Sequence, residues 1–216
     1  MLHGISVPKP PYQPLTLKEE PIMAATTQPI RSKKQIHELT AHYLKFGQLR
    51  NHVLIVITLY TALRISDVLR ISWDDVYDFA ANKVKKSITI IEKKTGKPKT
   101  IALHRAIISA LSLYAPKAAG RGCPLILNAK TGRAISRVQA YRLIRAAAEA
   151  VEIDERGSCH SLRKTFGYHA WKDGVSPAVL VEIYNHNSLA VTRRYLGVTQ
   201  DDKNAVYLGI ELADAI

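Results

Sequence analysis

The sequence predicts a mainly α-helical α+β fold with one small antiparallel β-sheet, and three observations lead to this prediction. Apolar residues recur at helical spacing in most segments after residue 31, often behind a Ser that is able to cap a helix. The region after Trp73 changes instead to runs rich in β-branched residues. The chain has 216 residues, 47% of them hydrophobic, so it is long enough to bury the core of one domain.

Residues 1–31 are predicted to form a Pro-rich flexible tail, and residues 32–216 the folded domain. No clean helical or alternating apolar period is visible in the tail. Six of the chain's ten prolines lie there: Pro8, Pro10, Pro11, Pro14, Pro21 and Pro29. A polyproline-type ligand for a partner protein is an alternative role for this segment.

The first helix is expected behind a capping box formed by Ser32 and Gln35, with a stop near Gly47. Residues 50–63 predict a second helix, which is apolar nearly all round and therefore belongs in the core. Ser66 is expected to cap a short helix that runs through Arg70.

The small sheet is predicted from residues 87–92 and 99–103, joined by a basic, Gly-bearing hairpin tip at residues 93–98. A helix over residues 105–114, a strand-like stretch over 125–127 and a turn over 130–133 are expected next. Ser136 and Gln139 then form a second capping box that opens another helix. This helix is expected to turn Tyr141, Ile144 and Ala148 inward and Arg137, Arg142 and Arg145 outward.

Three further helices are predicted over residues 160–172, 177–184 and 189–195, with a Gly174 stop and with Ser176 and Ser188 as caps. A last amphipathic helix over residues 202–213 carries an apolar stripe of Tyr207, Leu208, Ile210 and Leu212. We expect this C-terminal segment to dock on a neighbouring protomer or on the chain's own core.

The composition favours a polyanionic partner. Lys and Arg total 31 against 18 Asp and Glu, and the resulting formal charge of +13 favours nucleic acid over an ordinary basic surface. The two cysteines lack zinc-site spacing, and the first residues lack the pattern of a secretory signal. The longest apolar run, residues 53–59, is too short to span a bilayer. A cytoplasmic protein without a membrane segment is expected.

A group of Arg and His residues predicts a phosphate pocket. His160 and Arg163 stand three residues apart at a helix start, so both side chains leave one face beside free backbone N–H groups. The guanidinium groups of Arg64 and Arg163 could each hold phosphodiester oxygens in a bidentate way. Such fixed cations stabilise the charge that develops on a phosphodiester under attack.

The same region offers groups for nucleophilic attack. The phenol of Tyr195, with an ordinary pKa near 10, must lose a proton to attack phosphorus, and His160 or His186 can accept it. The departing sugar oxygen needs a proton donor, a role that a lysine of the hairpin tip suits. Considered singly, both histidines could be structural, and Arg64 could be an ordinary ion-pair partner of Asp67.

These segments resemble the motifs of the tyrosine recombinases, also called the phage integrase family. ALRISD (62–67) is similar to the first arginine box, KKTGK (93–97) to the hairpin lysine, and HSLRKTF (160–166) to the His-x-x-Arg box. NHNSLAVTRRYLG (185–197) resembles the last box, in which the histidine and the tyrosine lie nine residues apart. The resemblance covers about residues 32–207 and implies the fold of that family's catalytic domain.

The resemblance also implies a site-specific DNA recombinase, of the integrase or invertase type, that works through a covalent 3′-phosphotyrosine. The implied catalytic residues are Tyr195 as nucleophile, Arg64 and Arg163 as phosphate clamps, His160 and His186 as hydrogen-bonding and proton-moving groups, and Lys94 as general acid. Asp67 would buttress the first arginine, and Lys93 and Lys97 are alternatives to Lys94. No cofactor or metal is implied. The implied partners are duplex DNA, three more copies in a synaptic tetramer and a host DNA-bending protein, with the protein at the nucleoid when bound.

Some features depart from the family pattern. Lys164 replaces a frequent histidine, and Asn185 replaces the usual glycine before His186. Most members carry a helical N-terminal DNA-binding domain that is not expected here, although short recombinases such as the fimbrial phase-variation invertases are similar in lacking it. The alternatives are a type IB topoisomerase, a non-catalytic DNA-binding remnant of a recombinase, and a basic structural protein.

Overall fold

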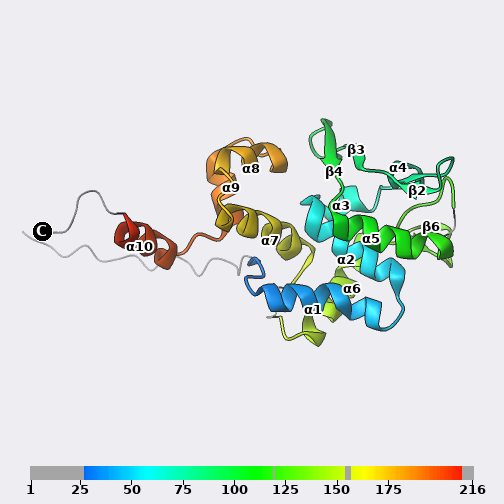
Figure 1. Cartoon of the computed structure of the whole chain (residues 1–216), viewed down its shortest axis with the longest axis horizontal. Coiled ribbons are helices and arrows are strands. Elements are labelled where there is room, and N and C mark those ends of the chain that lie inside the picture. Colours follow the sequence, from blue (N-terminus) through cyan, green and yellow to red (C-terminus); the bar gives the residue numbers. More distant parts are fainter. Residues whose placement is uncertain (1–26, 119, 154–156, 211–216) are drawn as a thin grey trace, which may run out of the picture.

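The computed structural model describes residues 27–118, 120–153 and 157–210, and its elements are mainly helices (Figure 1). The helices are α1 (Lys33–Lys45), α2 (Leu49–Thr61), α3 (Ile65–Val68), α4 (Trp73–Val76), α5 (Arg105–Tyr114), α6 (Arg137–Ala150), α7 (Cys159–Lys172), α8 (Pro177–Tyr184), α9 (Leu189–Leu196) and α10 (Gln200–Gly209), with one 3₁₀ turn, η1 (Ala115–Lys117). The strands are β1 (Tyr77–Asp78), β2 (Lys83–Val84), β3 (Ser87–Ile91), β4 (Pro98–Ala102), β5 (Leu127–Asn128) and β6 (Arg133–Ala134).

The predicted mainly helical fold is confirmed, but the expectation of one sheet is wrong. The described residues contain three two-stranded antiparallel sheets, β1–β2, β3–β4 and β5–β6. The β3–β4 hairpin was predicted, and it pairs Ser87 with Ala102 through to Ile91 with Pro98. For β5–β6 the sequence predicted the strand-like stretch that includes Leu127 and the turn over 130–133, but not the pairing. The other two pairs have two residues per strand, which is too short to leave an alternating apolar pattern in the sequence.

Helix α2 lies at the centre of the larger apolar core, as its all-round apolar sequence predicts. Leu54, Ile55 and Ile57 are fully buried, and α1, α5 and α7 pack around the helix. The helix ends where Ala62 adopts a left-handed conformation with φ of 54°. This reversal starts the segment that carries Arg64 away from the core.

Several caps form as predicted, and two differ. Ser136 and Gln139 make both bonds of a capping box, but at Ser32 only the hydroxyl takes part. The Gln35 side chain instead donates to the carbonyl of Glu152, which ties α1 to the end of α6. Ser66 does not cap α3, because that helix already begins at Ile65.

The inward face of α6 is narrower than predicted. Ile144 and Ala148 are buried as expected, while Tyr141 is 48% exposed. Ala140 and Ala147 complete the buried stripe, so small residues carry the contact that Tyr141 was expected to make. The exposed face keeps Arg137 and Arg142 in solvent.

Residues 27–31, assigned to the tail by the sequence, pack against α7. Ile30 is buried, its N–H donates to the Thr165 hydroxyl at 2.9 Å, and its carbonyl contacts His169 Nε2 at 3.0 Å. Lys164 donates to the Thr27 carbonyl at 2.6 Å, so this departure from the family pattern anchors the segment. We call residues 27–31 the N-terminal strap. The rest of the predicted tail lies outside the described residues.

The strap also reaches the end of α9. Arg31 donates to the carbonyl of Gly197, the left-handed residue that ends the helix. A Cβ on Gly197 would lie 3.0 Å from Pro29, and its φ of +60° is itself a conformation that favours glycine. The beginning of the described chain and the end of α9 are therefore in direct contact.

Helices α7, α8 and α9 enclose a second, smaller apolar cluster, and α10 lies apart. The buried members of this cluster are Ala62, Leu180, Tyr184 and Leu196. Helix α10 has no buried residue, and Figure 1 shows it at the left, outside the body of the molecule. Its apolar residues Tyr207, Leu208 and Ile210 are exposed, so they do not dock on the chain's own core, while Leu212 lies outside the described residues. No helix in the described part of the chain has the length and apolar character needed to cross a bilayer.

Candidate active site

Helix α7 presents His160 and Arg163 one turn apart, as their spacing predicts. The Ser158 hydroxyl caps the helix, and the two side chains have different environments. His160 is partly exposed and partly covered by its neighbours, whereas Arg163 is 1% exposed. Arg163 donates to the carbonyls of Ala62 and, at 3.0 Å, of Tyr184, so it joins the end of α2 to the end of α8.

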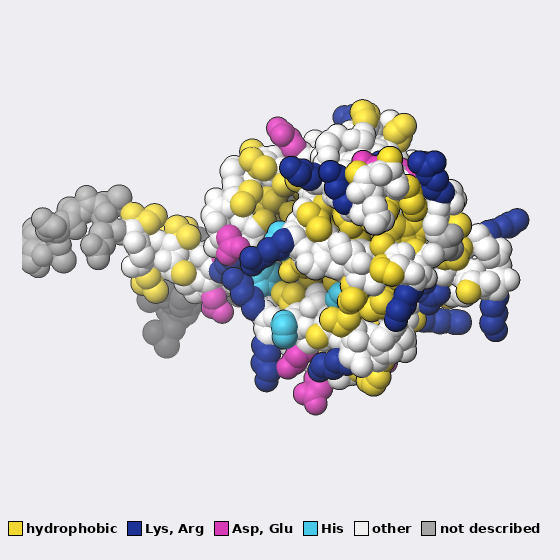
Figure 2. All heavy atoms as spheres, turned by 45° about the vertical axis from the view of Figure 1, so that its right-hand side comes forward, with side chains coloured by type: hydrophobic (Ala, Val, Ile, Leu, Met, Phe, Trp, Pro, Cys, Tyr) yellow, Lys and Arg dark blue, Asp and Glu magenta, His cyan; other side chains and the backbone are white. Residues whose placement is uncertain are grey.

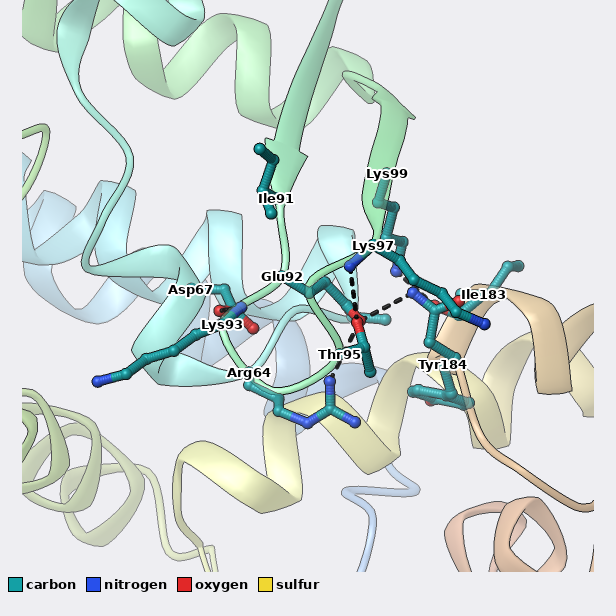
Figure 3. A network of polar contacts seen from close by, with 12 residues as sticks. Arg64, Asp67, Ile91, Glu92, Lys93, Thr95, Lys97, Lys99, Ile183 and Tyr184 are labelled. Atoms are coloured by element: carbon teal, nitrogen blue, oxygen red, sulfur yellow. Dashed lines mark hydrogen bonds and ion pairs between the residues drawn. The ribbon is translucent and has the colours of Figure 1, made fainter.

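Arg64 pairs with Glu92 rather than with the residue the sequence suggested. Its Nη1 lies 3.4 Å from Glu92 Oε2, and the Glu92 side chain is fully buried (Figure 3). Asp67, the expected buttress, accepts the backbone N–H of Lys93 at 2.9 Å instead. Asp67 therefore holds the start of the hairpin tip, and Glu92 holds the arginine.

Four of the six candidate residues line one cavity of about 1310 Å³: Arg64, Lys94, His160 and Arg163. Lys93 and Arg137 line it too, so its walls are strongly cationic. Arg163 Nε is buried and has no hydrogen-bond partner among the described residues, and buried Arg64 Nη1 has only its 3.4 Å ion pair with Glu92 there. Buried guanidinium N–H groups are costly to leave unpaired, and an anion in this cavity could satisfy them. Lys and Arg side chains are also spread over the face shown in Figure 2.

The other two candidates, His186 and Tyr195, lie beside this cavity and are not among its lining residues. The Tyr195 ring, on α9, lies 5.0 Å from the ring of His160 and 4.5 Å from that of His186, measured between centroids. Arg163 also approaches it, with Cζ 5.8 Å from the ring centre. Tyr195 is therefore half-buried between two imidazoles and beside the cationic wall.

Both histidines are held in the neutral form near neutral pH. Burial lowers the pKa of His160 to about 4, and the charges of Lys164, Arg163 and Arg64 add to the effect. Burial likewise lowers the pKa of His186 to about 4, with Arg163 and Arg64 contributing in the same direction. A neutral imidazole is able to accept a proton from a phenol.

The orientation of His186 is set by a neighbour that the sequence did not identify. Its Nδ1 lies 3.0 Å from the hydroxyl of Thr192, a buried residue one turn before Tyr195 on α9. The ring also stacks on Tyr184, with centroids 5.0 Å apart. Thr192 could have been found from the sequence only by its helical spacing to Tyr195.

The hairpin lysines occupy different positions. Lys94 and Lys93 line the cavity, whereas Lys97 is not among its lining residues. Lys99, which the sequence did not single out, donates to the Ile183 carbonyl from β4. Burial lowers the pKa of Lys99 to about 8, against the opposing charge of Glu92. Within the described residues, no group of three or more His, Cys, Asp and Glu side chains could hold a metal ion.

Comparisons with known proteins agree on one family. The model of the phage integrase family matches residues 31–201. The "Probable integrase/recombinase YoeC" of Bacillus subtilis is 36% identical over 180 residues, which cover 83% of this chain and 94% of that protein. "Tyrosine recombinase XerD" of Mycobacterium tuberculosis is 31% identical over 168 residues, 74% of this chain and 52% of that protein. The chain thus spans nearly all of the first relative and about half of the second.

Solved structures share the fold at lower sequence identity. The crystal structure of XerA recombinase superposes with a TM-score of 0.69 and 18% identity, covering 86% of this chain and 66% of that one. The XerH site-specific recombinase, in a post-cleavage complex with palindromic difH substrate, gives a TM-score of 0.67 and 19% identity. That match covers 86% of this chain and 53% of XerH.

Proposed function

This chain belongs to the phage integrase family of tyrosine recombinases, and from that premise we propose that Tyr195 cuts DNA at specific sites through a covalent 3′-phosphotyrosine. The observation that carries the proposal is the position of the Tyr195 ring between the rings of His160 and His186, beside a cavity lined by two arginines. A phenol needs a proton acceptor and nearby positive charge to act as a nucleophile near neutral pH, and both are present here.

The proposed phosphate clamp consists of Arg64 and Arg163. Both line the cavity; the buried Nε of Arg163 lacks a hydrogen-bond partner among the described residues, and the buried Nη1 of Arg64 has only its ion pair with Glu92. Two guanidinium forks can bind both non-bridging oxygens of a phosphodiester. They would bind more strongly as negative charge builds up on those oxygens in the transition state.

Residues of this chain can donate and accept every proton that the proposed cleavage step transfers. The Tyr195 oxygen forms a bond to phosphorus while the bond from phosphorus to the 5′ oxygen breaks. The phenolic proton passes to His160 or His186, and Lys94 gives a proton to the departing 5′ oxygen. Strand joining runs the same transfers in reverse. Because the phosphotyrosine keeps the free energy of the broken bond, the reaction requires no external energy source.

A small movement of Tyr195 is part of the proposal, because Tyr195 is not among the residues that line the cavity. Its helix rests on the smaller apolar cluster and ends two residues later at Gly197. We expect α9 or the Tyr195 side chain to shift towards the phosphate when DNA binds.

The proposed partners are duplex DNA and three further copies of the chain in a synaptic tetramer. The formal charge of +13 and the cationic cavity support DNA. The exposed apolar residues of α10 support docking on a neighbouring copy, and a variant that lacks residues 204–216 should assemble less well on DNA. A host DNA-bending protein and action at the nucleoid in the cytoplasm complete the proposal.

The proposed catalytic domain begins with the N-terminal strap at residue 27 rather than at residue 32. Ile30 is buried against α7, and Lys164 holds the Thr27 carbonyl, so the strap packs as part of the domain. The C-terminal docking segment retains its predicted place after α9.

A nicked suicide duplex tests the function. The duplex carries a labelled sequence from repeats that flank the gene, with the nick beside the exchange point, and denaturing gels detect a covalent protein–DNA band. We expect the band for the wild-type protein, no band for Tyr195→Phe, and a normal band for the control Tyr77→Phe, whose hydroxyl only bonds Asn82 in the β1–β2 hairpin.

Other outcomes select the alternatives. Binding of the duplex without a band in any variant would indicate a non-catalytic DNA-binding protein. Relaxation of any supercoiled plasmid by the lone protein would indicate a topoisomerase-like activity.

A further inference from the structure

Glu92 lies where three parts of the molecule meet. It follows β3 at the base of the hairpin tip and faces Arg64 (Figure 3). It also accepts a hydrogen bond from Asn185, the residue after α8. The Glu92 side chain is completely buried, with a relative accessibility of 0%. A buried carboxylate requires partners that replace its lost hydration, so these contacts indicate which groups it holds.

One carboxylate oxygen of Glu92 collects three donors from different segments. Oε2 accepts the Thr95 hydroxyl at 3.0 Å and the Asn185 side-chain amide at 2.8 Å, and lies 3.4 Å from Arg64 Nη1. Thr95 belongs to the hairpin tip, directly after Lys94. Asn185 directly precedes His186. The one oxygen therefore links the neighbours of the proposed acid, a proposed phosphate clamp and a proposed proton acceptor.

The backbone of Glu92 closes the hairpin tip as well. Its N–H donates to the Lys97 carbonyl at 3.0 Å, and its carbonyl accepts the Gly96 N–H at 2.8 Å. Gly96 has a φ of +67°, which allows the tight turn. Lys94 thus sits in a loop whose far end, at Gly96 and Lys97, is hydrogen-bonded back to the Glu92 backbone.

The backbone conformation and the contacts of Asn185 explain how it can replace the family's usual glycine. It has a φ of 50° and ends α8 in the left-handed conformation, which Gly adopts most easily and Asn tolerates better than most other residues. Unlike Gly, Asn adds an amide, and here the amide donates to Glu92. The Asn185 side chain thus links the His186 segment to the base of the hairpin tip, beside the bond from Lys99 to the Ile183 carbonyl.

Glu92 is ionised in this network. Burial alone would raise its pKa, but the hydrogen bonds from Asn185 and Thr95, with the charges of Lys99 and Arg64, hold the pKa of Glu92 below its usual value. An ionised carboxylate binds its donors about twice as strongly as a neutral acceptor does.

We propose that Glu92 is a positioning residue: through Thr95 and Asn185 it fixes the hairpin tip that carries Lys94, and the His186 segment, against Arg64 before DNA binds. This inference rests on the proposed function, since it assigns the arrangement of the general acid. A residue that only stabilises the fold would make the same contacts. The test must therefore measure the proton-transfer step itself.

The test uses Thr95→Val and Asn185→Gly, each with a matched control, together with Glu92→Gln. Thr95→Ser restores the hydroxyl, and Asn82→Gly replaces the other left-handed Asn, φ 48°, in the β1–β2 turn far from the site. Single-turnover cleavage is measured on the ordinary suicide duplex and on one whose bridging 5′ oxygen is sulfur. A thiolate leaves without a proton donor, so the second duplex bypasses the acid.

We expect Thr95→Val and Asn185→Gly to cleave the ordinary duplex about 10–100-fold more slowly, because a small displacement of an aligned group has this effect. The sulfur duplex should restore most of the loss in Thr95→Val, as it should for Lys94→Ala, and only part of the loss in Asn185→Gly, which also displaces the His186 segment. Affinity for DNA should stay within about twofold, since no phosphate contact is removed. Glu92→Gln keeps the size of the side chain and isolates the effect of its charge. Thr95→Ser and Asn82→Gly should cleave at the wild-type rate.

Equal slowing of Thr95→Val on both duplexes would overturn the proposal, because Glu92 would then act on the fold or on phosphate binding rather than on the acid. A wild-type rate in Asn185→Gly would overturn it too. Amide hydrogen exchange without DNA tests the contact separately: residues 93–97 should exchange faster in Asn185→Gly than in Asn82→Gly, and unchanged exchange would reject the link. A wild-type protein that forms no adduct on either duplex, while this exchange behaves as expected, would instead reject the proposed function.

Discussion

The two halves of the proposed active site rest on apolar cores of very different size. Arg64 and the β3–β4 hairpin are attached to the larger core, which is built around α2 and extends from Ile30 to Leu162. Tyr195 and His186 are attached to the smaller cluster, whose buried members are Ala62, Leu180, Tyr184 and Leu196. A phosphate clamp must be preorganised. A nucleophile that has to move to reach the phosphate needs a supporting cluster that is easily displaced. The difference in packing matches this difference in task.

The Arg163 side chain connects these two halves through hydrogen bonds. It stands on α7, bonds the carbonyls of Ala62 and Tyr184, and its Cζ lies 4.7 Å from the centre of the Tyr184 ring. A single side chain therefore both faces the cavity and holds the smaller cluster to the end of α2. Changes at Arg163 should affect both halves, as should changes in the bond between Glu92 and Asn185, whereas truncations inside one core should affect one half.

Arg163→Lys is expected to have the largest effect. Lysine lacks the planar fork that reaches two carbonyls and a phosphate together, so cleavage should fall by about 10²–10³-fold. Suicide-duplex kinetics measure the loss, with Arg105→Lys at the exposed start of α5 as the control. Wild-type kinetics in Arg163→Lys would show that the two halves are joined by other contacts.

Shortening a buried side chain in each core should show that the two halves open independently. Ile57→Ala, in the larger core, should lower the free energy of unfolding by about 2–5 kcal/mol, as buried large-to-small changes do. Leu196→Ala, in the smaller cluster, should speed amide exchange in α8 and α9 and leave the protection of α2 unchanged. Hydrogen exchange with mass spectrometry measures both. Equal deprotection of α2 by the two variants would mean that the halves unfold as one unit.

Gly167→Ala tests the packing between α7 and α8. A Cβ at residue 167 would collide with the Tyr184 ring, whose hydroxyl donates to the Arg163 carbonyl at 2.8 Å. We expect a loss of about 1–3 kcal/mol in unfolding free energy, which is usual for overpacking, together with slower cleavage. Gly209→Ala is the control in urea unfolding, because nothing lies within 4 Å of its added methyl group. A neutral result at residue 167 would show that Tyr184 can move freely.

The pH dependence of the folding stability should be the smallest effect near neutral pH. His160 and His186 have pKa values of about 4 in the folded chain, against an ordinary value of 6.5. The unfolded state then binds more protons between these values, so stability should fall as pH drops from 6.5 towards 4 and should not change through these groups above that window. Urea midpoints measure this fall. NMR titration should also show that Arg64→Gln raises both pKa values, and titration near pH 6.5 in the wild-type protein would contradict the prediction.

Local signals predicted much of this structure. Ser136, Ser176 and Ser188 cap their helices as expected, because a cap and an apolar period lie within a few neighbouring residues. The candidate residues were also found from local motifs, and the structure brings four of them to one cavity and the other two beside it.

Contacts distant in sequence were not predicted. Glu92 and Asn185 are 93 residues apart, and no local pattern indicates that they bond. The expected pairing of Arg64 with Asp67 failed for the same reason, since the partner of each is chosen by the position of the hairpin. Tyr141 was placed inward by periodicity alone, whereas small residues on α6 leave it exposed.

The N-terminal strap has a consequence for building fusion proteins. Pro29 and Arg31 lie against Gly197, two residues after Tyr195, so a module attached in front of residue 27 begins close to the nucleophile. A short linker to a foreign DNA-reading module would hold its target near the cutting site at an effective concentration on the order of millimolar. Linker length, rather than any change in the catalytic residues, would then select which phosphates along the duplex come within reach.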